Sequence, residues 1–339
     1  MACHVKTGGK YFRLVVLTGL LVVSVLTACS GADSSGSSDR PSQPAEATAR
    51  AVPPPEAVTL AELGASEVPV RGALDWMADD GATLYVKTDS GSVAVIDPAK
   101  SAEVRRLPLG ARGLCQGIGA GGGAAWSCSP EASGLADDVL RVNPKSSRVL
   151  RFEVEKRGDQ GHLDVTADRV WVITDAGLVG LDVRTGQADP PIDLGLPGTD
   201  LAATDDRAYV VSRGAGAVVE VDLAGQRVVA QSAVPDARAV AVSDQVWVVT
   251  GRELVAFGKE RLEETARIPI EGAPCSVAAR GEHVFVGSTQ PLLTEVDAKT
   301  HQVSRVVTDT NSQCGDVHVA FGSIWLSANE GDVVHRIPL

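Results

Sequence analysis

Seven side chains of types that can do chemistry fall on or near the innermost strand-like runs of a repeated pattern. Carboxylates and imidazoles bind divalent cations or act as general acids and bases, and a tryptophan ring offers a ligand an apolar face. The candidates are Asp75, Trp76, His162, Asp164, Asp200, Asp316 and His318. Aspartates before strands also cap turns, and no His-x-His or repeated His/Glu motif gathers the histidines. We therefore expect a ligand site and assign no catalytic residue, metal or cofactor.

Four of the six cysteines suggest a second chemistry, disulfide formation in an oxidising compartment. If a hairpin turns at Gly121-Gly122, antiparallel pairing places Cys115 opposite Cys128, close enough for a disulfide. Cys275 and Cys314 are 39 residues apart and precede two aromatics of a repeat by similar distances. We expect both pairs to be bonded. A metal site is the alternative, but no Cys-x-x-Cys spacing supports it.

The elements that must position these residues follow from aromatics that recur along the chain at intervals of 41, 45, 38, 38, 38 and 40 residues. A period near 40 residues, filled with short alternating apolar runs, is typical of a β-propeller whose blades are small antiparallel sheets. The sequence thus predicts an all-β fold, a seven-bladed β-propeller. The seven aromatics are Tyr85, Trp126, Trp171, Tyr209, Trp247, Phe285 and Trp325.

Each repeat contains four strand-like runs. A small-residue run such as 238–242 suits the crowded innermost strand, and the aromatic-centred run, such as 245–249, follows it. A third run ends in an acid or amide that starts a turn, as at Asp97 and Asp222. A fourth run with an internal proline, such as 106–109, is typical of an edge strand. Chemistry-bearing residues on the innermost runs would face a central channel.

Ring closure can also be predicted. The seventh repeat stops at Leu339, where its third strand should end, and residues 67–72 match the fourth-strand pattern ahead of the first inner strand. We expect this N-terminal strand to join the last blade and close the ring. Without it the first and last blades would each expose an unpaired sheet edge.

Two stretches, RAYVVSRGAGAVVEVDLAGQRVVA at 207–230 and TLYVKTDSGSVAVIDP at 83–98, resemble the seven-bladed YVTN-type propeller repeat of bacterial surface and periplasmic proteins. The similarity covers residues 66–339 or so. It implies a rigid disc used for binding and does not imply one shared reaction. The Val-Trp-Val strands are also similar to those of virginiamycin B lyase-like propellers, but no residue of that lyase's metal-and-histidine cluster has a counterpart here.

The N-terminus has the features of a bacterial lipoprotein signal. Lys6, Lys10 and Arg13 precede an apolar run at 14–26, which is shorter than the roughly 20 residues a membrane span needs. Small residues then lead to Cys29, which we expect to be lipidated after cleavage of a signal peptide at 1–28. Several acyl chains at about 0.8 kcal/mol per buried CH₂ would hold the protein on a membrane.

Residues 29–58 are rich in Ser, Gly, Ala and Pro, with too little apolar content to fold, so we expect a disordered tether before a propeller at 59–339. Removing residues 1–28 changes the net charge from −12 to −15 because Lys6, Lys10 and Arg13 are lost. Such an acidic protein lacks the Lys/Arg density that nucleic acid requires. The arginine-rich, Ala/Gly/Val-rich composition resembles high-GC Gram-positive usage, although a Gram-negative periplasm stays open.

These observations predict a monomeric, membrane-anchored extracytoplasmic propeller that serves as a binding or scaffolding module. Its partner would be an envelope protein or a small-molecule ligand. The alternative is a divalent-metal-dependent lyase or hydrolase that acts at the channel mouth, and its activity would depend on His162 or His318.

Overall fold

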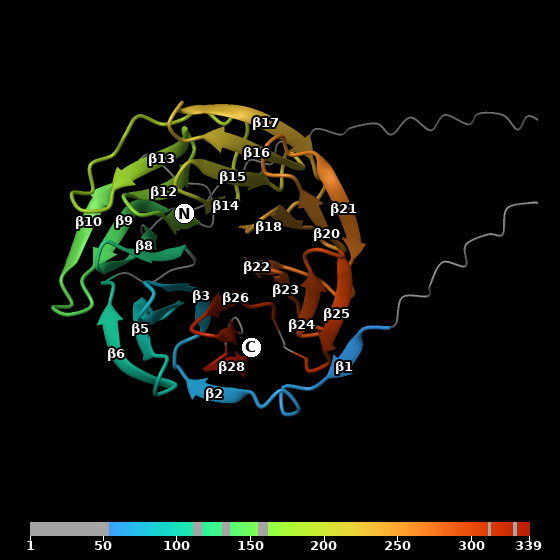
Figure 1. Ribbon diagram of the computed structural model, residues 1–339. Helices are drawn as coiled ribbons and strands as arrows, with labels where there is room; N and C mark the ends of the chain where they lie inside the picture. The colour runs from blue at the N-terminus through green and yellow to red at the C-terminus, as the bar shows by residue number, and fades with distance from the viewer. Residues whose placement is uncertain (1–53, 111–116, 131–135, 155–161, 311–312, 328–330) are drawn as a thin grey trace, which may run out of the picture. The chain divides into compact units, whose positions relative to one another are not determined.

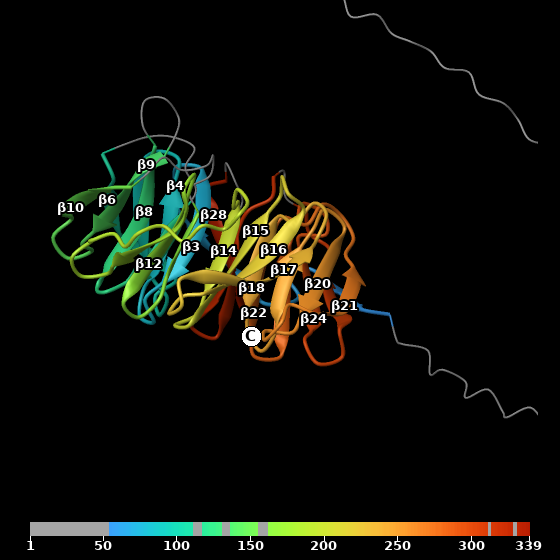
Figure 2. The same ribbon diagram turned by 90° about the horizontal axis from the view of Figure 1, so that it is seen from above.

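The protein's structure is a computed structural model that describes residues 54–110, 117–130, 136–154, 162–310, 313–327 and 331–339. Residues 52–339 form one compact unit. All elements assigned in the described residues are β-strands, and they make seven sheets that follow one another around a ring (Figure 1). Figure 2 shows the same ring turned by 90°, with strands of successive blades side by side. The predicted seven-bladed β-propeller is confirmed.

The strands have four ranks, from the middle of the ring outward. The innermost strands are β3 (Leu74–Asp79), β7 (Ile118–Gly121), β11 (Leu163–Val165), β14 (Asp200–Ala203), β18 (Ala239–Val242), β22 (Ser276–Arg280) and β26 (Val317–Ala320). The second strands are β4 (Leu84–Thr88), β8 (Ala124–Pro130), β12 (Arg169–Thr174), β15 (Arg207–Ser212), β19 (Val246–Val249), β23 (His283–Gly287) and β27 (Ser323–Leu326).

The third strands are β5 (Ser92–Asp97), β9 (Ala136–Val142), β13 (Gly177–Asp182), β16 (Ala217–Asp222), β20 (Glu253–Phe257), β24 (Leu293–Asp297) and β28 (Val333–Pro338). The outer strands are β6 (Ala102–Pro108), β10 (Val149–Glu153), β17 (Arg227–Ala233), β21 (Glu264–Pro269), β25 (Gln302–Val307) and β2 (Ser66–Pro69), with β1 (Glu56–Val58) beyond β25. Neighbouring strands within a blade are antiparallel, apart from β1 and β25.

The repeated aromatics form the contacts between blades. All seven lie on second strands and are at most 7% exposed. Trp247 of the fifth blade packs with Val284 and Val286 of the sixth, and Trp325 of the seventh packs with Leu84 of the first. An aromatic ring removes 150–250 Å² or so from water when it is buried. One such residue in each blade therefore fixes the spacing of the ring, which explains the period in the sequence.

The ring closes as predicted. Strand β2 pairs antiparallel with β28 and supplies the outer strand of the seventh blade, and Val68 lies opposite Val334. Val68 and Val70 are fully buried. The next residues return to the first blade, where Gly72 N donates to Asp332 Oδ1 at 2.9 Å. Strands from both ends of the chain are thus joined in one antiparallel sheet.

The folded region begins earlier than expected. Residues 56–58, which the sequence assigned to the tether, form β1 and pair in parallel with β25 at the outer edge of the sixth blade. The connection to β2 is also packed, because Leu60 and Leu63 contact the hydrophobic cluster between the sixth and seventh blades. Low apolar content in the preceding residues hid this strand, since three residues give no measurable periodicity.

The inner hairpin of the second blade corrects the predicted register. Its turn lies at Gly122-Gly123, both with positive φ, so Gly121 pairs with Ala124. Two consecutive glycines with positive φ suit the tight turn of a hairpin. The pairing is therefore shifted by two residues from the expected one, and Cys128 N donates to Gly117 O at 3.2 Å.

The third blade departs from the repeat, because only three strands are assigned to its sheet. Instead of an outer strand, the following segment makes two isolated bridges to β13, Leu178 with Ile192 and Leu181 with Ala188. Pro190 lies between the two bridges and has no N–H to continue the ladder.

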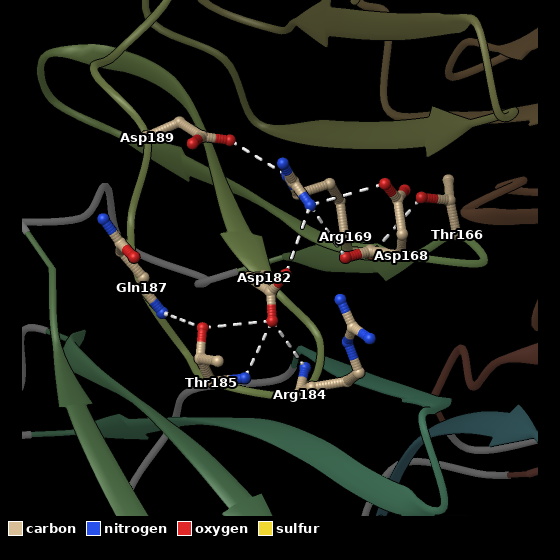
Figure 3. A network of polar contacts seen from close by, with 8 residues as sticks. All are labelled: Thr166, Asp168, Arg169, Asp182, Arg184, Thr185, Gln187 and Asp189. Atoms are coloured by element: carbon tan, nitrogen blue, oxygen red, sulfur yellow. Dashed lines mark hydrogen bonds and ion pairs between the residues drawn. The ribbon is translucent and has the colours of Figure 1, made fainter.

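Side-chain contacts complete the third blade where the ladder stops. Arg169 on β12 reaches Asp168, Asp182 and Asp189, with its Nε 3.0 Å from Asp189 Oδ2 (Figure 3). Asp182 in turn accepts the backbone N–H of Thr185 at 2.8 Å and holds the next turn. Asp189 lies on the segment that replaces the outer strand, so the ion pair ties that segment to the sheet.

Candidate functional site

The innermost strands of all seven blades enclose one cavity of about 660 Å³. Ala and Val are the commonest residues in its wall, in agreement with the small-residue pattern of the inner runs. Six of the seven candidates from the sequence line this cavity: Trp76, His162, Asp164, Asp200, Asp316 and His318. The structure therefore brings together residues that are up to 242 positions apart in the sequence.

Asp75 differs from the expectation. It is not among the cavity-lining residues and is 2% exposed. Its Oδ2 lies 3.1 Å from Lys87 Nζ, and both side chains are buried. A bulge in β3 causes the change, because the register against β4 shifts between Leu74 and Met77. Burial raises the pKa of Asp75 to about 6, although the charge of Lys87 opposes this shift.

Three of the lining aspartates hold adjacent blades together. In each case Oδ2 accepts a backbone N–H from the inner strand of the next blade. The bonds are Ala203 N to Asp164 at 2.8 Å, Val240 N to Asp200 at 3.0 Å and Met77 N to Asp316 at 2.9 Å. A hydrogen bond to a carboxylate is stronger than one between neutral groups. We call these three aspartates the latch aspartates.

The surroundings of two of the latch aspartates, Asp164 and Asp316, disfavour their charge. Burial raises the pKa of Asp164, and the backbone N–H groups of Ala203 and Val165 only partly oppose it. Burial likewise raises the pKa of Asp316 to about 7, and the negative charge of Asp200 adds to this shift. The cavity therefore holds carboxylates that repel one another.

Trp76 and His162 meet across the cavity from the first and third blades. The indole Nε1–H of Trp76 donates to Nδ1 of His162 at 3.0 Å, and the two ring centroids are 5.5 Å apart. The same nitrogen lies 3.0 Å from Oδ1 of Asp200 in the fourth blade. His162 is 8% exposed, and Trp76 is half-buried. The contact between Trp76 and His162 spans 86 residues.

His318 forms a second imidazole–carboxylate pair, this time between the seventh and first blades. Its Nε2 lies 2.8 Å from Oδ2 of Asp79, a lining residue that sequence reasoning missed. Burial acts to raise the pKa of Asp79, but the hydrogen bond and charge of His318 bring it below its ordinary value. Asp79 is the last residue of β3. Because residues two apart in a strand lie on the same face, its spacing from Met77 and Asp75 was the available signal.

Sequence reasoning also missed two arginines in the lining, Arg213 and Arg238. Asp236 binds both, with Oδ2 2.8 Å from Arg238 Nη2 and Oδ1 3.3 Å from Arg213 Nε. Arg238 directly precedes the inner strand β18, as Asp316 precedes β26, and this equivalent position was the signal. Among the described residues, no group of three or more His, Cys, Asp or Glu is arranged to hold a metal ion.

The cysteines have different outcomes. Cys275 and Cys314 form a disulfide with Cα atoms 6.3 Å apart, which joins the segments before β22 and β26 at the cavity wall. Cys128 is buried and disulfide-bonded, while Cys115 lies outside the described residues, so their pairing stays a prediction. Cys29 also lies outside the described residues. No helix in the part of the chain that the structure describes is long and apolar enough to span a membrane.

Comparisons with known proteins bear on the fold. No family model and no curated protein matches the chain. BamB from Moraxella catarrhalis is similar over 79% of this chain and 86% of its own, with 15% identity and a TM-score of 0.56. Kuenenia stuttgartiensis hydrazine synthase is similar over 80% of this chain and 96% of its own, with 14% identity and a TM-score of 0.65. At these identities the similarity shows the fold alone, and the YVTN-type resemblance stays an expectation.

Proposed function

We propose that this protein is an extracytoplasmic lipoprotein, anchored through Cys29, whose propeller is a rigid binding or scaffolding module for a protein or a small ligand. The observation that carries the proposal is the use of the lining carboxylates. Asp164, Asp200 and Asp316 each accept a backbone N–H from the neighbouring blade, so they stabilise the ring. Groups committed to the scaffold preorganise a binding surface instead of moving during a reaction.

The disulfide supports the proposed location. Bonds such as Cys275–Cys314 persist outside the cytoplasm, where thiols are not kept reduced. The apolar run at 14–26 followed by Cys29 fits a lipoprotein signal. The acidic propeller would be repelled by anionic lipid headgroups, so a tether of about 25 residues would hold it clear of the membrane. A Gram-positive cell surface is the location we favour.

A metal-dependent lyase or hydrolase is the second candidate, and one observation favours it. Two imidazole–carboxylate pairs, His162 with Asp200 and His318 with Asp79, line the same cavity. A carboxylate that orients an imidazole is a common arrangement in general acid–base catalysis. If this candidate holds, His162→Gln and His318→Gln would each abolish turnover in protein that is still folded, as judged by its melting transition.

Crosslinking of intact cells tests the first proposal. Tagged wild-type protein is crosslinked in cells, and the recovered proteins are compared with those from a Cys29→Ser variant, which lacks the acceptor thiol for lipid. A stoichiometric partner that depends on Cys29 supports the anchored scaffold. Recovery of the propeller alone would contradict the protein-scaffold form and leave the small-ligand form, which the next experiment addresses.

A further inference from the structure

One carboxylate oxygen on the cavity wall, Oδ1 of Asp200, accepts no hydrogen bond from the described residues. Nδ1 of His162 lies 3.0 Å from the indole Nε1 of Trp76 and 3.0 Å from Oδ1 of Asp200. The first neighbour is a donor and the second is an acceptor. A single ring nitrogen carries either a lone pair or a proton, so it can satisfy only one of them.

The geometry favours the arrangement in which Nδ1 of His162 carries a lone pair and accepts from Trp76. The Trp76 contact is a hydrogen bond with Nδ1 as the acceptor, whereas the Asp200 contact is a close approach that no hydrogen bond accompanies in the described residues. Oδ2 of Asp200 is already occupied by Val240 N. Oδ1 therefore faces a lone pair, and an external donor at Oδ1 would satisfy all three groups at once. The Asp200 side chain is 15% exposed and lines the cavity, so a ligand in the cavity can reach it.

The charges of the lining decide what kind of donor fits. The described lining residues include four carboxylates, those of Asp79, Asp164, Asp200 and Asp316, two guanidinium groups, Arg213 and Arg238, and two imidazoles, His162 and His318. Both arginines are paired with Asp236, and Asp79 is paired with His318. The negative charge of Asp200 also acts on its neighbours Asp164 and Asp316. A positively charged donor relieves this repulsion, whereas an anion would increase it.

The remaining wall defines the body of the ligand. The volume of about 660 Å³ lies in the range of small-molecule sites. Trp76 is half-buried and packs beside Ile118 and Ala120 of the second blade. An indole ring attracts both apolar groups and cations. The His162 ring lies beside it, with the two centroids 5.5 Å apart.

We propose that the channel binds a small organic cation, with a primary ammonium group that donates to Oδ1 of Asp200 and an aromatic or apolar body that rests against Trp76. His162 holds Trp76 in place by accepting its indole N–H. This inference rests on the proposed binding function and names the class of small ligand that the propeller takes.

Three matched probes test the charge requirement by calorimetry on the full chain in detergent at pH 7.5. Phenethylamine, 2-phenylethanol and 3-phenylpropanoate share one body and differ in charge. We expect saturable one-to-one binding of phenethylamine, at least about tenfold weaker binding of the alcohol, and no saturable binding of the anion. A tenfold difference corresponds to about 1.4 kcal/mol. Equal affinities for amine and alcohol, or no amine binding up to about 10 mM, would overturn the proposal.

Two variants locate the site. Asp200→Asn removes the charge and should weaken phenethylamine binding by about tenfold or more. Asp332→Asn is the matched control, because Asp332 also accepts a backbone N–H across a blade boundary, at 2.9 Å, but does not line the cavity. It should lose similar stability and keep full binding. If both variants bind as the wild type does, the amine binds elsewhere and the proposal fails.

The two proposals fail separately. If phenethylamine does not bind and crosslinking in cells still recovers a partner that depends on Cys29, the cation site is wrong and the anchored scaffold stands. If phenethylamine binds through Asp200 and no protein is recovered, the propeller is a small-ligand module.

Discussion

At the boundary between the third and fourth blades the chain runs directly from one blade to the next, whereas between the seventh and first blades its two ends meet. Both boundaries contain the same latch. Asp164 accepts Ala203 N at 2.8 Å in the first case, and Asp316 accepts Met77 N at 2.9 Å in the second. In the first case, chain connectivity already keeps the two inner strands close together.

The closing boundary adds a polar network that the other lacks. Ser327 Oγ donates to Asp75 O at 2.9 Å, and its oxygen accepts Asp316 N at 3.0 Å. The buried pair of Asp75 and Lys87 lies directly beside these groups, and Arg336 Nη1 reaches Pro98 O at 2.9 Å. The comparison shows that the closing boundary has these side-chain bonds in addition to the latch and to the chain connection from β2 to β3.

Deletion of residues 66–71 should have the largest effect. It removes the strand β2, the paired backbone groups along β28 and two fully buried valines, so the loss should be about 5 kcal/mol or more. Thermal unfolding followed by circular dichroism should show a much lower melting temperature. Deletion of residues 54–58, which removes only β1, is the control and should lower it less. An unchanged melting curve for the first deletion would contradict the closure.

Lys87→Met should be next in size. It leaves Asp75 buried without its counter-charge, which costs about 3–5 kcal/mol at pH 8. The loss should be smaller at pH 5, because burial already raises the pKa of Asp75 to about 6 and the carboxyl can then be neutral. Urea denaturation at both pH values measures the difference. The double variant Lys87→Met/Asp75→Leu should recover most of the stability, and failure to do so would show that packing, not charge, dominates.

The disulfide beside the closing boundary should contribute less. Cys275→Ala/Cys314→Ala opens a 39-residue loop and should lower the free energy of unfolding by about 2–4 kcal/mol. Reduction of the wild type also breaks the disulfide of Cys128, so it should lower the melting temperature at least as much as the double substitution does. If removing the bond leaves the melting temperature unchanged, the closing network alone holds these two blades.

Substitution of the latch aspartates Asp164 and Asp316 should have the smallest effects on stability, and for Asp316 the effect should depend on pH. Asp164→Asn and Asp316→Asn should each cost about 1 kcal/mol at pH 5. The pKa of Asp316 is raised from 3.8 to about 7, so the folded protein binds that proton more tightly, and wild-type stability falls as pH rises through this window. Asp316→Asn lacks this penalty and should therefore compare better with the wild type at pH 8 than at pH 5. A denaturant series at both pH values would contradict the burial argument if the difference were constant.

Much of the fold could be predicted from the sequence because packing between blades requires one aromatic in each repeat. Closure by β2 was also predictable, since the last blade lacks a strand that residues near Val68 match. The irregular third blade was not, because Asp189 substitutes for a strand through a side-chain contact that leaves no periodic signal. Local irregularities are where pattern reasoning fails.

The candidate site was predictable as a set of positions but not as a set of contacts. Inner-strand residues face the cavity in any propeller, so His162 and Asp200 could be placed there from the register. The contacts of His162 with Trp76 and Asp200 depend on a bulge in β3 and on three separate blades, which no local pattern encodes. The same bulge moved Asp75 from the cavity into a buried pair with Lys87.

The short strand β1 also gives the domain an order of mechanical loading. Any pull transmitted along the N-terminal segment reaches β1 on the sixth blade first, then the packed connection around Leu60 and Leu63, and only then β2. Detaching β1 breaks a three-residue parallel pairing and leaves the ring closed. We therefore expect the pairing of β1 with β25 to break first under a pull on the N-terminal segment, and to form again when the pull ends, while β2 stays paired with β28.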